Sequence, residues 1–270
     1  MILRTPFTKY HGAGNDFVVI DFRHSPPPSD FPSFARRLCE RRLGIGADGL
    51  LLLFPSAIAD YKICIFNADG SEPSMCGNGI RCAFDFIQKK ENTPLELKIE
   101  TLHGVLECRR SGAEIAVNLG APRILHWPIE LAQGTIFVLD TGVPHAVLFV
   151  DEIGKVDVAK EGAAIRFHAQ FAPRGVNVNF VSIDSKEEIM LRTYERGVEG
   201  ETLACGTGAA ASAFVARKER GLPPLISVST RASFEKMDYR QSLRFQFCRD
   251  NQIEMIGKAE EVFEGFIDIL

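Results

Sequence analysis

Several features that mark common protein classes are missing from this chain of 270 residues. Lysine and arginine number 31 against 35 acidic residues, so the formal net charge is -4 and the basic excess typical of nucleic-acid-binding domains is absent. No apolar run approaches the ~20 residues that a membrane-spanning helix needs. Residues 1–6 lack the apolar core and cleavage site of a signal peptide. We therefore expect a cytoplasmic protein that binds neither nucleic acid nor membranes.

The cysteines form no disulfide or zinc pattern. They number 7, which is odd, and they include no CxxC pair or other spacing typical of structural zinc ligands. The phosphate-binding motif G-x-x-x-x-G-K-[ST] is also missing, and no G-x-G-x-x-G follows a predicted strand. We therefore expect no metal and no cofactor. Five cysteines in helical or alternating apolar segments are predicted to be buried small hydrophobic residues: Cys39, Cys64, Cys82, Cys108 and Cys248.

The other two cysteines, Cys76 and Cys205, lie in two copies of one pattern. Glu, three residues, Cys-Gly, a small polar residue and Gly occur at residues 72–79 and again 205 − 76 = 129 positions later, at residues 201–208. A strand-like alternating segment precedes each copy, and a helical pattern follows it. The match extends over strand, turn and helix, which favours a duplicated unit over two unrelated turns.

The duplication predicts an α+β protein with two pseudo-symmetric lobes. A second repeated motif supports the duplication, since Phe-Val-x-Ile-Asp occurs at residues 17–21 and 180–184. In each lobe we expect strands wrapped around one central helix, with the active site in the cleft between the lobes. The predicted N-terminal lobe, residues 1–119 plus 257–270, carries Cys76, and the C-terminal lobe, residues 120–256, carries Cys205. Further strands are expected over residues 49–54, 95–101, 105–109, 136–140, 146–150 and 242–247, and a helix over residues 33–42.

Each Cys-Gly-x-Gly is expected where a strand gives way to a helix. Glycine lets the backbone approach a ligand closely, and the first N–H groups of a helix, with its macrodipole, can hold a carboxylate. The same field lowers the pKa of a nearby thiol. Two such motifs that face opposite sides of one carbon atom could invert its configuration. The thiolate of one cysteine would remove a proton, and the thiol of the other cysteine would deliver one to the opposite face.

Five stretches, in order between residues 7 and 211, resemble the diaminopimelate epimerase family of cofactor-independent amino-acid racemases and epimerases. They are centred on His-Gly-Ala-Gly-Asn at 11–15, the two cysteine motifs, Thr-Gly-Val-Pro-His at 141–145 and Gly-Val-Asn-Val-Asn-Phe at 175–180. The second cysteine motif is preceded by Tyr-Glu-Arg-Gly. The resemblance implies an isomerase that interconverts LL- and meso-diaminopimelate in lysine and peptidoglycan precursor synthesis. It also implies a cytoplasmic homodimer.

The resemblance also implies roles for individual residues. Cys76 and Cys205 would be the catalytic bases, and His145 and Glu195 would adjust their protonation. The substrate pocket would be lined by Asn15, Asn67, Asn177, Glu195 and Arg196. Backbone groups of Gly77, Asn78, Gly206 and Thr207 would clamp the carboxylate next to the reacting carbon.

The sequence departs from the family pattern at two places. Val143 stands where the family has asparagine, and Glu199 is one extra residue in the loop after Arg196. Both fall where the family grips the distal end of the substrate, which predicts looser recognition and turnover of a smaller amino acid such as glutamate. The alternatives are a related racemase for another amino acid, a thiol-redox switch that pairs Cys76 with Cys205, and a module that only binds amino acids.

Overall fold

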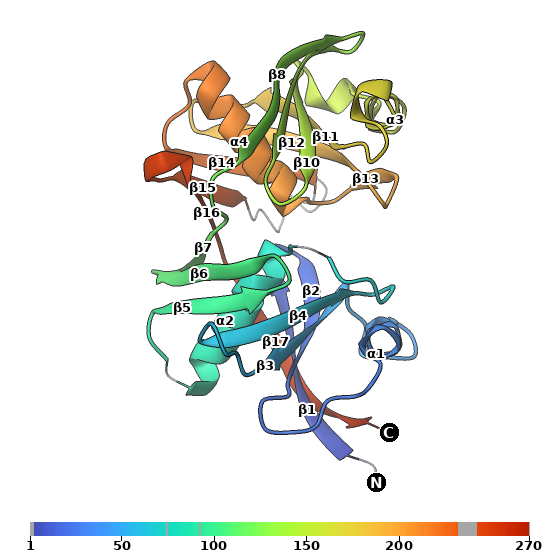
Figure 1. Cartoon of the computed structure of the whole chain (residues 1–270), viewed down its shortest axis with the longest axis vertical. Helices are drawn as coiled ribbons and strands as arrows, with labels where there is room; N and C mark the ends of the chain where they lie inside the picture. Colours follow the sequence, from blue (N-terminus) through green and yellow to red (C-terminus); the bar gives the residue numbers. More distant parts are fainter. Residues whose placement is uncertain (1–2, 74, 92, 232–241, 270) are drawn as a thin grey trace. The chain divides into compact units, whose positions relative to one another are not determined.

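The chain divides into two compact units, residues 1–117 with 257–270 and residues 118–256 (Figure 1). Among the residues that the structure describes, each unit combines β-strands with two α-helices, which confirms the predicted α+β class. No helix in the described part of the chain is long and apolar enough to cross a membrane. The structure, a computed structural model, describes residues 3–73, 75–91, 93–231 and 242–269.

The first unit is built on a mixed sheet. Strands β2–β3 and β4–β5 pair in parallel, and the other neighbours pair antiparallel. Helix α1 (Phe31–Cys39) connects β2 to β3, and helix α2 (Gly77–Glu91) connects β4 to β5. The sheet order is β17 (Glu260–Ile269), β1 (Leu3–Gly12), β2 (Asn15–Asp21), β3 (Gly49–Phe54), β4 (Tyr61–Asn67), β5 (Glu96–Thr101), β6 (Gly104–Ser111) and β7 (Glu114–Asn118).

The second unit repeats this arrangement. Its parallel pairs are β10–β11 and β12–β14, each connected by a helix, α3 (Val158–Arg166) and α4 (Gly206–Arg220). The succession of parallel and antiparallel pairs is the same as in the first unit, which supports a duplicated origin. The sheet order is β8 (Arg123–Leu131), β9 (Gly134–Asp140), β10 (Pro144–Phe149), β11 (Asn177–Ile183), β12 (Glu188–Glu195), β14 (Leu225–Thr230), β15 (Leu243–Phe247) and β16 (Ile253–Gly257), and β13 (Gly200–Thr202) pairs with β12.

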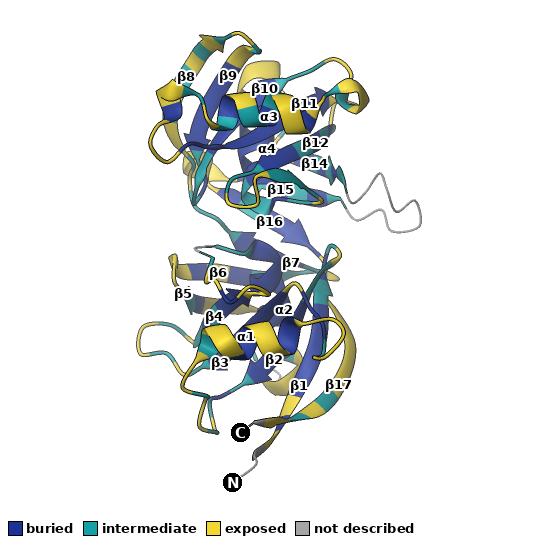
Figure 2. Ribbon diagram, turned by 90° about the vertical axis from the view of Figure 1, so that its right-hand side faces the viewer, coloured by how far each residue is buried: buried dark blue, intermediate teal, exposed yellow. Residues whose placement is uncertain are grey.

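The second helix of each unit is buried and the first is half exposed. Every residue from Gly77 to Ile87 in α2 and from Gly208 to Ala216 in α4 is buried. In contrast, α1 and α3 show exposed residues along one side (Figure 2). Helices α2 and α4 are therefore the central helices that the sequence predicted. Helices α1 and α3 instead contribute to clusters that include residues of the neighbouring strands β3 and β11.

Strand β3 shows why the sequence folds this way. Its run Gly-Leu-Leu-Leu-Leu-Phe is apolar on both sides, which is typical of a strand covered by helices on both faces. Leu50 and Leu52 pack in the cluster that contains α1 residues such as Phe34 and Leu38. Leu51 instead lies against Gly79 of α2, where a Cβ on the glycine would come 3.0 Å from the leucine side chain.

Two sequence interpretations are wrong. One is that the repeated motif Phe-Val-x-Ile-Asp is a trace of the duplication. Its two copies lie on β2 and β11, whereas by topology β2 corresponds to β10. Short buried strands favour the same β-branched and aromatic residues, so short similarities of this kind arise without common ancestry. Cys248 is exposed rather than buried, because β15 ends at Phe247 and the chain turns into a 3₁₀ helix (Arg249–Asn251). Cys39, Cys82 and Cys108 are buried as predicted, and Cys64 is half-buried.

The predicted helix over residues 33–42 is shifted toward the N-terminus. It begins at Phe31 and ends at Cys39. The Asp30 side chain accepts a hydrogen bond from the Ser33 N–H at 3.0 Å, and this cap fixes the start of the helix two residues earlier than its apolar spacing indicated.

Candidate active site

Each predicted catalytic cysteine stands directly before the buried helix of its unit. The Ile80 N–H donates to the Cys76 carbonyl at 3.0 Å, and the Ala209 N–H donates to the Cys205 carbonyl at 2.8 Å. The Cys76 sulfur also accepts from the Gly79 N–H at 3.5 Å. Both sulfurs therefore lie beside first-turn N–H groups and the positive end of a helix dipole, an arrangement that can hold a carboxylate.

A chain of side-chain hydrogen bonds runs beside Cys76. Arg81 has no exposed surface, and its guanidinium donates to Asn78 Oδ1 at 2.6 Å. The Asn78 amide donates to Asn15 Oδ1 at 3.4 Å, and the Asn15 amide donates to Asp48 Oδ2 at 3.0 Å. A guanidinium only donates and a carboxylate only accepts, so the two ends fix both amides. Asn15 thus presents an acceptor oxygen to the Cys76 thiol, 3.9 Å away.

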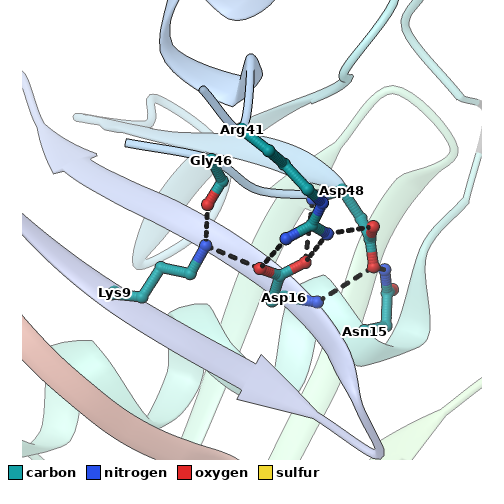
Figure 3. A network of polar contacts seen from close by, with 6 residues as sticks. All are labelled: Lys9, Asn15, Asp16, Arg41, Gly46 and Asp48. Carbon is teal, nitrogen blue, oxygen red and sulfur yellow. Dashed lines mark hydrogen bonds and ion pairs between the residues drawn. The ribbon is translucent and has the colours of Figure 1, made fainter. Parts of the chain in front are cut away.

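Asp48 belongs to a network of charges around the start of β2 (Figure 3). The Arg41 guanidinium lies 2.8 Å from Asp48 Oδ1 and 2.8 Å from Asp16 Oδ1. On the other side of Asp16, the Lys9 ammonium lies 2.6 Å from Oδ2 and also donates to the Gly46 carbonyl. The network joins β1, β2 and the segment before β3, and so it fixes the backbone next to Asn15.

Acid is expected to weaken the first unit through Asp16. Burial raises the pKa of this carboxyl, but hydrogen bonds from Arg41 and Lys9 outweigh that effect and hold the pKa below its usual range. A depressed pKa contributes stability above the unfolded value of ~3.9, and this stability is lost as pH falls. In urea titrations from about pH 5 to pH 2, the unfolding free energy of Asp16→Asn should decline less steeply than that of the wild type.

The control for this experiment is Asp184→Asn, which removes an exposed carboxyl from the other unit. Its stability should follow the wild-type pH dependence. An Asp16→Asn protein that loses stability with acid as steeply as the wild type would show that the network does not couple to acid unfolding.

In the second unit, His145 reaches Cys205 through a hydroxyl group. His145 is fully buried in β10, and its Nε2 lies 3.0 Å from Thr207 Oγ1. Thr207 Oγ1 in turn lies 3.6 Å from Cys205 Sγ. On the other side of the ring, Nδ1 lies 3.0 Å from the amide nitrogen of Asn179. The structure therefore brings together three predicted site residues, His145, Thr207 and Cys205, and adds Asn179.

The half-site of the second unit consists of Cys205 with its neighbours His145, Thr207 and Asn179. Burial dominates the protonation of its titratable groups. It raises the pKa of the Cys205 thiol to about 12, with the nearby Glu195 carboxyl as a second cause and the Thr207 hydroxyl partly opposing it. The first-turn N–H groups of Thr207 and Gly208 lower this pKa, as expected at a helix N-terminus, but desolvation of the thiolate outweighs them. Burial and then the Arg196 charge lower the pKa of His145 to about 3. Burial also raises the pKa of Glu195, against an opposing hydrogen bond from Thr202.

Asn177 ties the loop after β12 to the strand that carries His145. Its Oδ1 accepts from the Arg196 backbone N–H at 2.9 Å, and its amide donates to the Pro144 carbonyl at 3.0 Å. The Arg196 guanidinium donates to the Gly175 carbonyl at 3.4 Å. The predicted substrate residues Asn177 and Arg196 thus lie together beside His145.

The extra residue of this loop, Glu199, is neutralised inside its own unit. Its φ is 53°, in the left-handed region, and its carboxylate lies 3.0 Å from the Arg166 guanidinium of α3. The same carboxylate accepts from the Gly197 N–H at 3.1 Å. The insertion is therefore accommodated by a local turn and an ion pair.

Asn67, a predicted substrate residue, takes no part in the hydrogen-bond networks described above. It is exposed at the end of β4, and its amide donates to the Ser71 hydroxyl at 2.9 Å. Gly77 and Gly206 are the first residues of α2 and α4. Across the residues that the structure describes, no cluster of three or more His, Cys, Asp or Glu side chains could hold a metal ion.

Three residues of the hydrogen-bond chains beside the two cysteines were not predicted from the sequence: Asp48 and Arg81 in the half-site around Cys76, and Asn179 in the half-site around Cys205. Two of them carried a usable signal. Asn179 lies two positions after Asn177 in a strand, so both face the same side, and Arg81 lies three positions after Asn78 on one helix face. Asp48 gave no such signal, because its contact with Asn15 joins residues far apart in the sequence.

Comparisons with known proteins identify the family of this chain. The family model for diaminopimelate epimerase matches residues 7–125 and 137–260. The diaminopimelate epimerase of Methanocella arvoryzae is 40% identical over 280 residues, which cover 97% of this chain and 96% of that protein. The diaminopimelate epimerase of Aquifex aeolicus is 40% identical over 276 residues, 96% of each chain.

A solved structure extends the likeness to the whole fold. The Bacillus anthracis phenazine biosynthesis protein of the PhzF family superimposes with a TM-score of 0.73 at 16% identity and covers 99% of each chain. At that identity the similarity concerns the fold alone. The family match and the relatives near 40% identity go further, since they span nearly the whole sequence. The chain therefore belongs to the diaminopimelate epimerase family.

Proposed function

We propose that this chain is an isomerase that interconverts LL- and meso-diaminopimelate with Cys76 and Cys205 as its two acid–base groups. The observation that carries the proposal is the repetition of one cysteine, at one place, in two topologically equivalent units. Each sulfur stands before the first turn of a buried helix. Family membership and relatives named diaminopimelate epimerase support the choice of substrate.

The proposed reaction moves one proton off and one proton on. A cysteine thiolate takes the α-proton, and the electron pair left on carbon is delocalised into the adjacent carboxylate. The thiol of the other cysteine then donates its proton from the opposite face and becomes a thiolate. The mechanism requires both half-sites to contact one α-carbon, and it needs no oxidant or reductant. Because the reaction is reversible, each cysteine is a base in one direction and an acid in the other.

Electrostatic stabilisation must supply much of the rate, because an amino-acid α-proton is very weakly acidic. Carboxylate charge would be held by first-turn N–H groups at Gly77-Asn78 and Gly206-Thr207. These groups are fixed before substrate arrives, so the site does not have to reorganise as charge develops. His145 and Glu195 would tune the protonation of Cys205 through Thr207 and through their charge state.

The remaining predicted residues would hold the far end of the substrate. Arg196 can pair bidentately with a carboxylate, and Glu195 can accept from an ammonium group. Asn15 and Asn177 bring amide groups to the same two half-sites, and Asn67 would have to contact the substrate from its exposed position. A site with these polar groups penalises a substrate that leaves them unsatisfied.

The setting that suits this chemistry is the cytoplasm, where lysine and peptidoglycan precursors would be made. Proton transfer by thiols needs both cysteines reduced, and a reducing compartment keeps Cys76 and Cys205 in that state. The homodimer implied by the family resemblance stays part of the proposal, and analytical ultracentrifugation of the purified chain tests it.

The first experiment is incubation of the reduced protein with LL-diaminopimelate in D2O. We expect deuterium at the α-carbon together with formation of the meso isomer. Glutamate in a parallel reaction measures how far recognition of the distal end is loosened by Val143, and undetectable glutamate turnover would remove that idea. A protein that exchanges glutamate but not diaminopimelate would be a related racemase.

The redox and binding alternatives predict other results in the same experiment. A thiol-redox switch would convert neither amino acid, and oxidation would join Cys76 to Cys205 reversibly. A binding module would bind diaminopimelate without any deuterium uptake. Absence of exchange for both amino acids under reducing conditions would therefore refute the proposed function.

A further inference from the structure

Asn179 lies at the centre of the polar chain that ends at Cys205. Its side chain has no exposed surface, and it lies on β11 two residues after Asn177. Three neighbours surround its amide: the Ala146 carbonyl at 3.1 Å, the Thr193 hydroxyl at 3.0 Å and His145 Nδ1 at 3.0 Å. The proposed mechanism assigns Asn179 no role, yet a buried amide satisfied on three sides is held in one orientation.

The direction of each hydrogen bond follows from groups that can act in only one way. The Ala146 carbonyl can only accept, so the amide nitrogen of Asn179 faces it. The Asn179 oxygen must then accept from the Thr193 hydroxyl. The second N–H of Asn179 points at His145 Nδ1, and that ring nitrogen must therefore be the acceptor.

The protonation of His145 sets the direction of the next hydrogen bond. An imidazole that accepts at Nδ1 carries its hydrogen on Nε2, and this N–H donates to Thr207 Oγ1 at 3.0 Å. A hydroxyl group has one hydrogen. With its oxygen accepting from His145, the Thr207 hydroxyl can direct that hydrogen toward Cys205 Sγ, 3.6 Å away, when the sulfur is a thiolate that only accepts. The lowered pKa of His145, about 3, agrees with a neutral ring.

We propose that Asn179 is a positioning residue for Cys205: it fixes His145 in the Nε2–H tautomer and so aims the Thr207 hydroxyl hydrogen at the sulfur. Hydrogen bonding to the charged form favours that form, so the donor helps Cys205 to become a thiolate despite its burial. The inference rests on the proposed function only in treating Cys205 as a base. The tautomer itself belongs to the protein without substrate.

The first test is the ¹⁵N spectrum of the histidine rings in the wild-type protein, with His145 assigned from His145→Gln. We expect a protonated Nε2 and an unprotonated, hydrogen-bonded Nδ1. In Asn179→Asp the carboxylate can only accept, so the hydrogen should move to Nδ1. A wild-type signal with the hydrogen on Nδ1 would overturn the inference, whether or not the variant folds.

The second test is the rate at which iodoacetamide alkylates Cys205, followed by peptide mass spectrometry over a range of pH. Asn179→Ala should slow alkylation at neutral pH by roughly tenfold, the effect of one lost hydrogen bond to a charged acceptor. Thr207→Val should slow it similarly, and the double variant should be no slower than either single one.

Ser182→Ala is the matched control, since Ser182 is a buried polar residue on the same strand. It should leave both the spectrum and the alkylation rate unchanged. Wild-type alkylation in Asn179→Ala, or equal slowing in Ser182→Ala, would show that Asn179 acts only through packing. Neither measurement uses a substrate, so a protein with the expected tautomer but no epimerisation would refute the proposed function and leave this inference standing.

Discussion

Epimerisation of diaminopimelate should fall by roughly 10³-fold or more when Cys76 or Cys205 is replaced by alanine, because acid–base groups contribute about 10²–10⁴-fold each and inversion needs both. The fold places both sulfurs. Cys205 is only 8% exposed, and the Cys76 sulfur is placed by the Gly79 N–H. The rate of formation of the meso isomer from the LL isomer measures the loss in kcat/KM.

Deuterium uptake distinguishes loss of one base from loss of the whole site. A variant with one remaining cysteine can still remove and return a proton on the face that this cysteine meets. Any exchange that survives in Cys76→Ala should therefore concern one stereoisomer, and any that survives in Cys205→Ala should concern the other. Cys248→Ser, which alters an exposed thiol, should keep wild-type rates. Inversion at a rate close to that of the wild type in either alanine variant would exclude a two-cysteine mechanism.

The parts of the fold that could be predicted from sequence are those with strong local signals. The run of leucines in β3 identified a buried strand with its correct bounds, Gly49–Phe54. The repeated Cys-Gly-x-Gly placed both cysteines correctly before a helix, because glycines and apolar spacing mark such a turn. The weakly patterned strand β8 (Arg123–Leu131), which is exposed at alternate positions, was not identified.

The organisation of the half-sites depended on contacts that sequence patterns do not encode. The ion pair between Arg41 and Asp16 crosses 25 positions, and the hydrogen bond between Asn15 and Asp48 crosses 33. The net pKa shift of Cys205 depends on how completely the fold buries the thiol, and the position of the helix alone does not reveal that burial. The local sequence indicates on which element a functional side chain lies. Tertiary packing decides the protonation state of that side chain.

The two half-sites are alike in backbone and different in side chains. Cys76 and Cys205 hold equivalent places, yet the thiol of Cys76 faces a carbonyl oxygen of Asn15 while the sulfur of Cys205 faces the Thr207 hydroxyl. A duplicated backbone thus carries two cysteines at equivalent places with different polar neighbours.

A methyl group added at Gly208 should disrupt the second half-site. A Cβ there would lie 2.3 Å from Asn179 Oδ1 and 3.3 Å from Cys205 Sγ. Asn179 cannot move away without breaking its hydrogen bonds to Thr193 and His145. We expect Gly208→Ala to lower kcat/KM by about 100-fold, the effect of a displacement near 1 Å, and to lower the unfolding free energy by about 1–3 kcal/mol through overpacking.

Gly154→Ala is the matched comparison in the same unit, because a Cβ at Gly154 meets no atom within 4 Å. This variant should keep wild-type kcat/KM and stay within about 0.5 kcal/mol of the wild-type stability. Urea unfolding separates the two contributions in Gly208→Ala. Alanine favours a helix interior over glycine by about 1 kcal/mol, so any destabilisation must come from the clash. A stable Gly208→Ala protein with wild-type activity would mean that Asn179 can move without affecting Cys205.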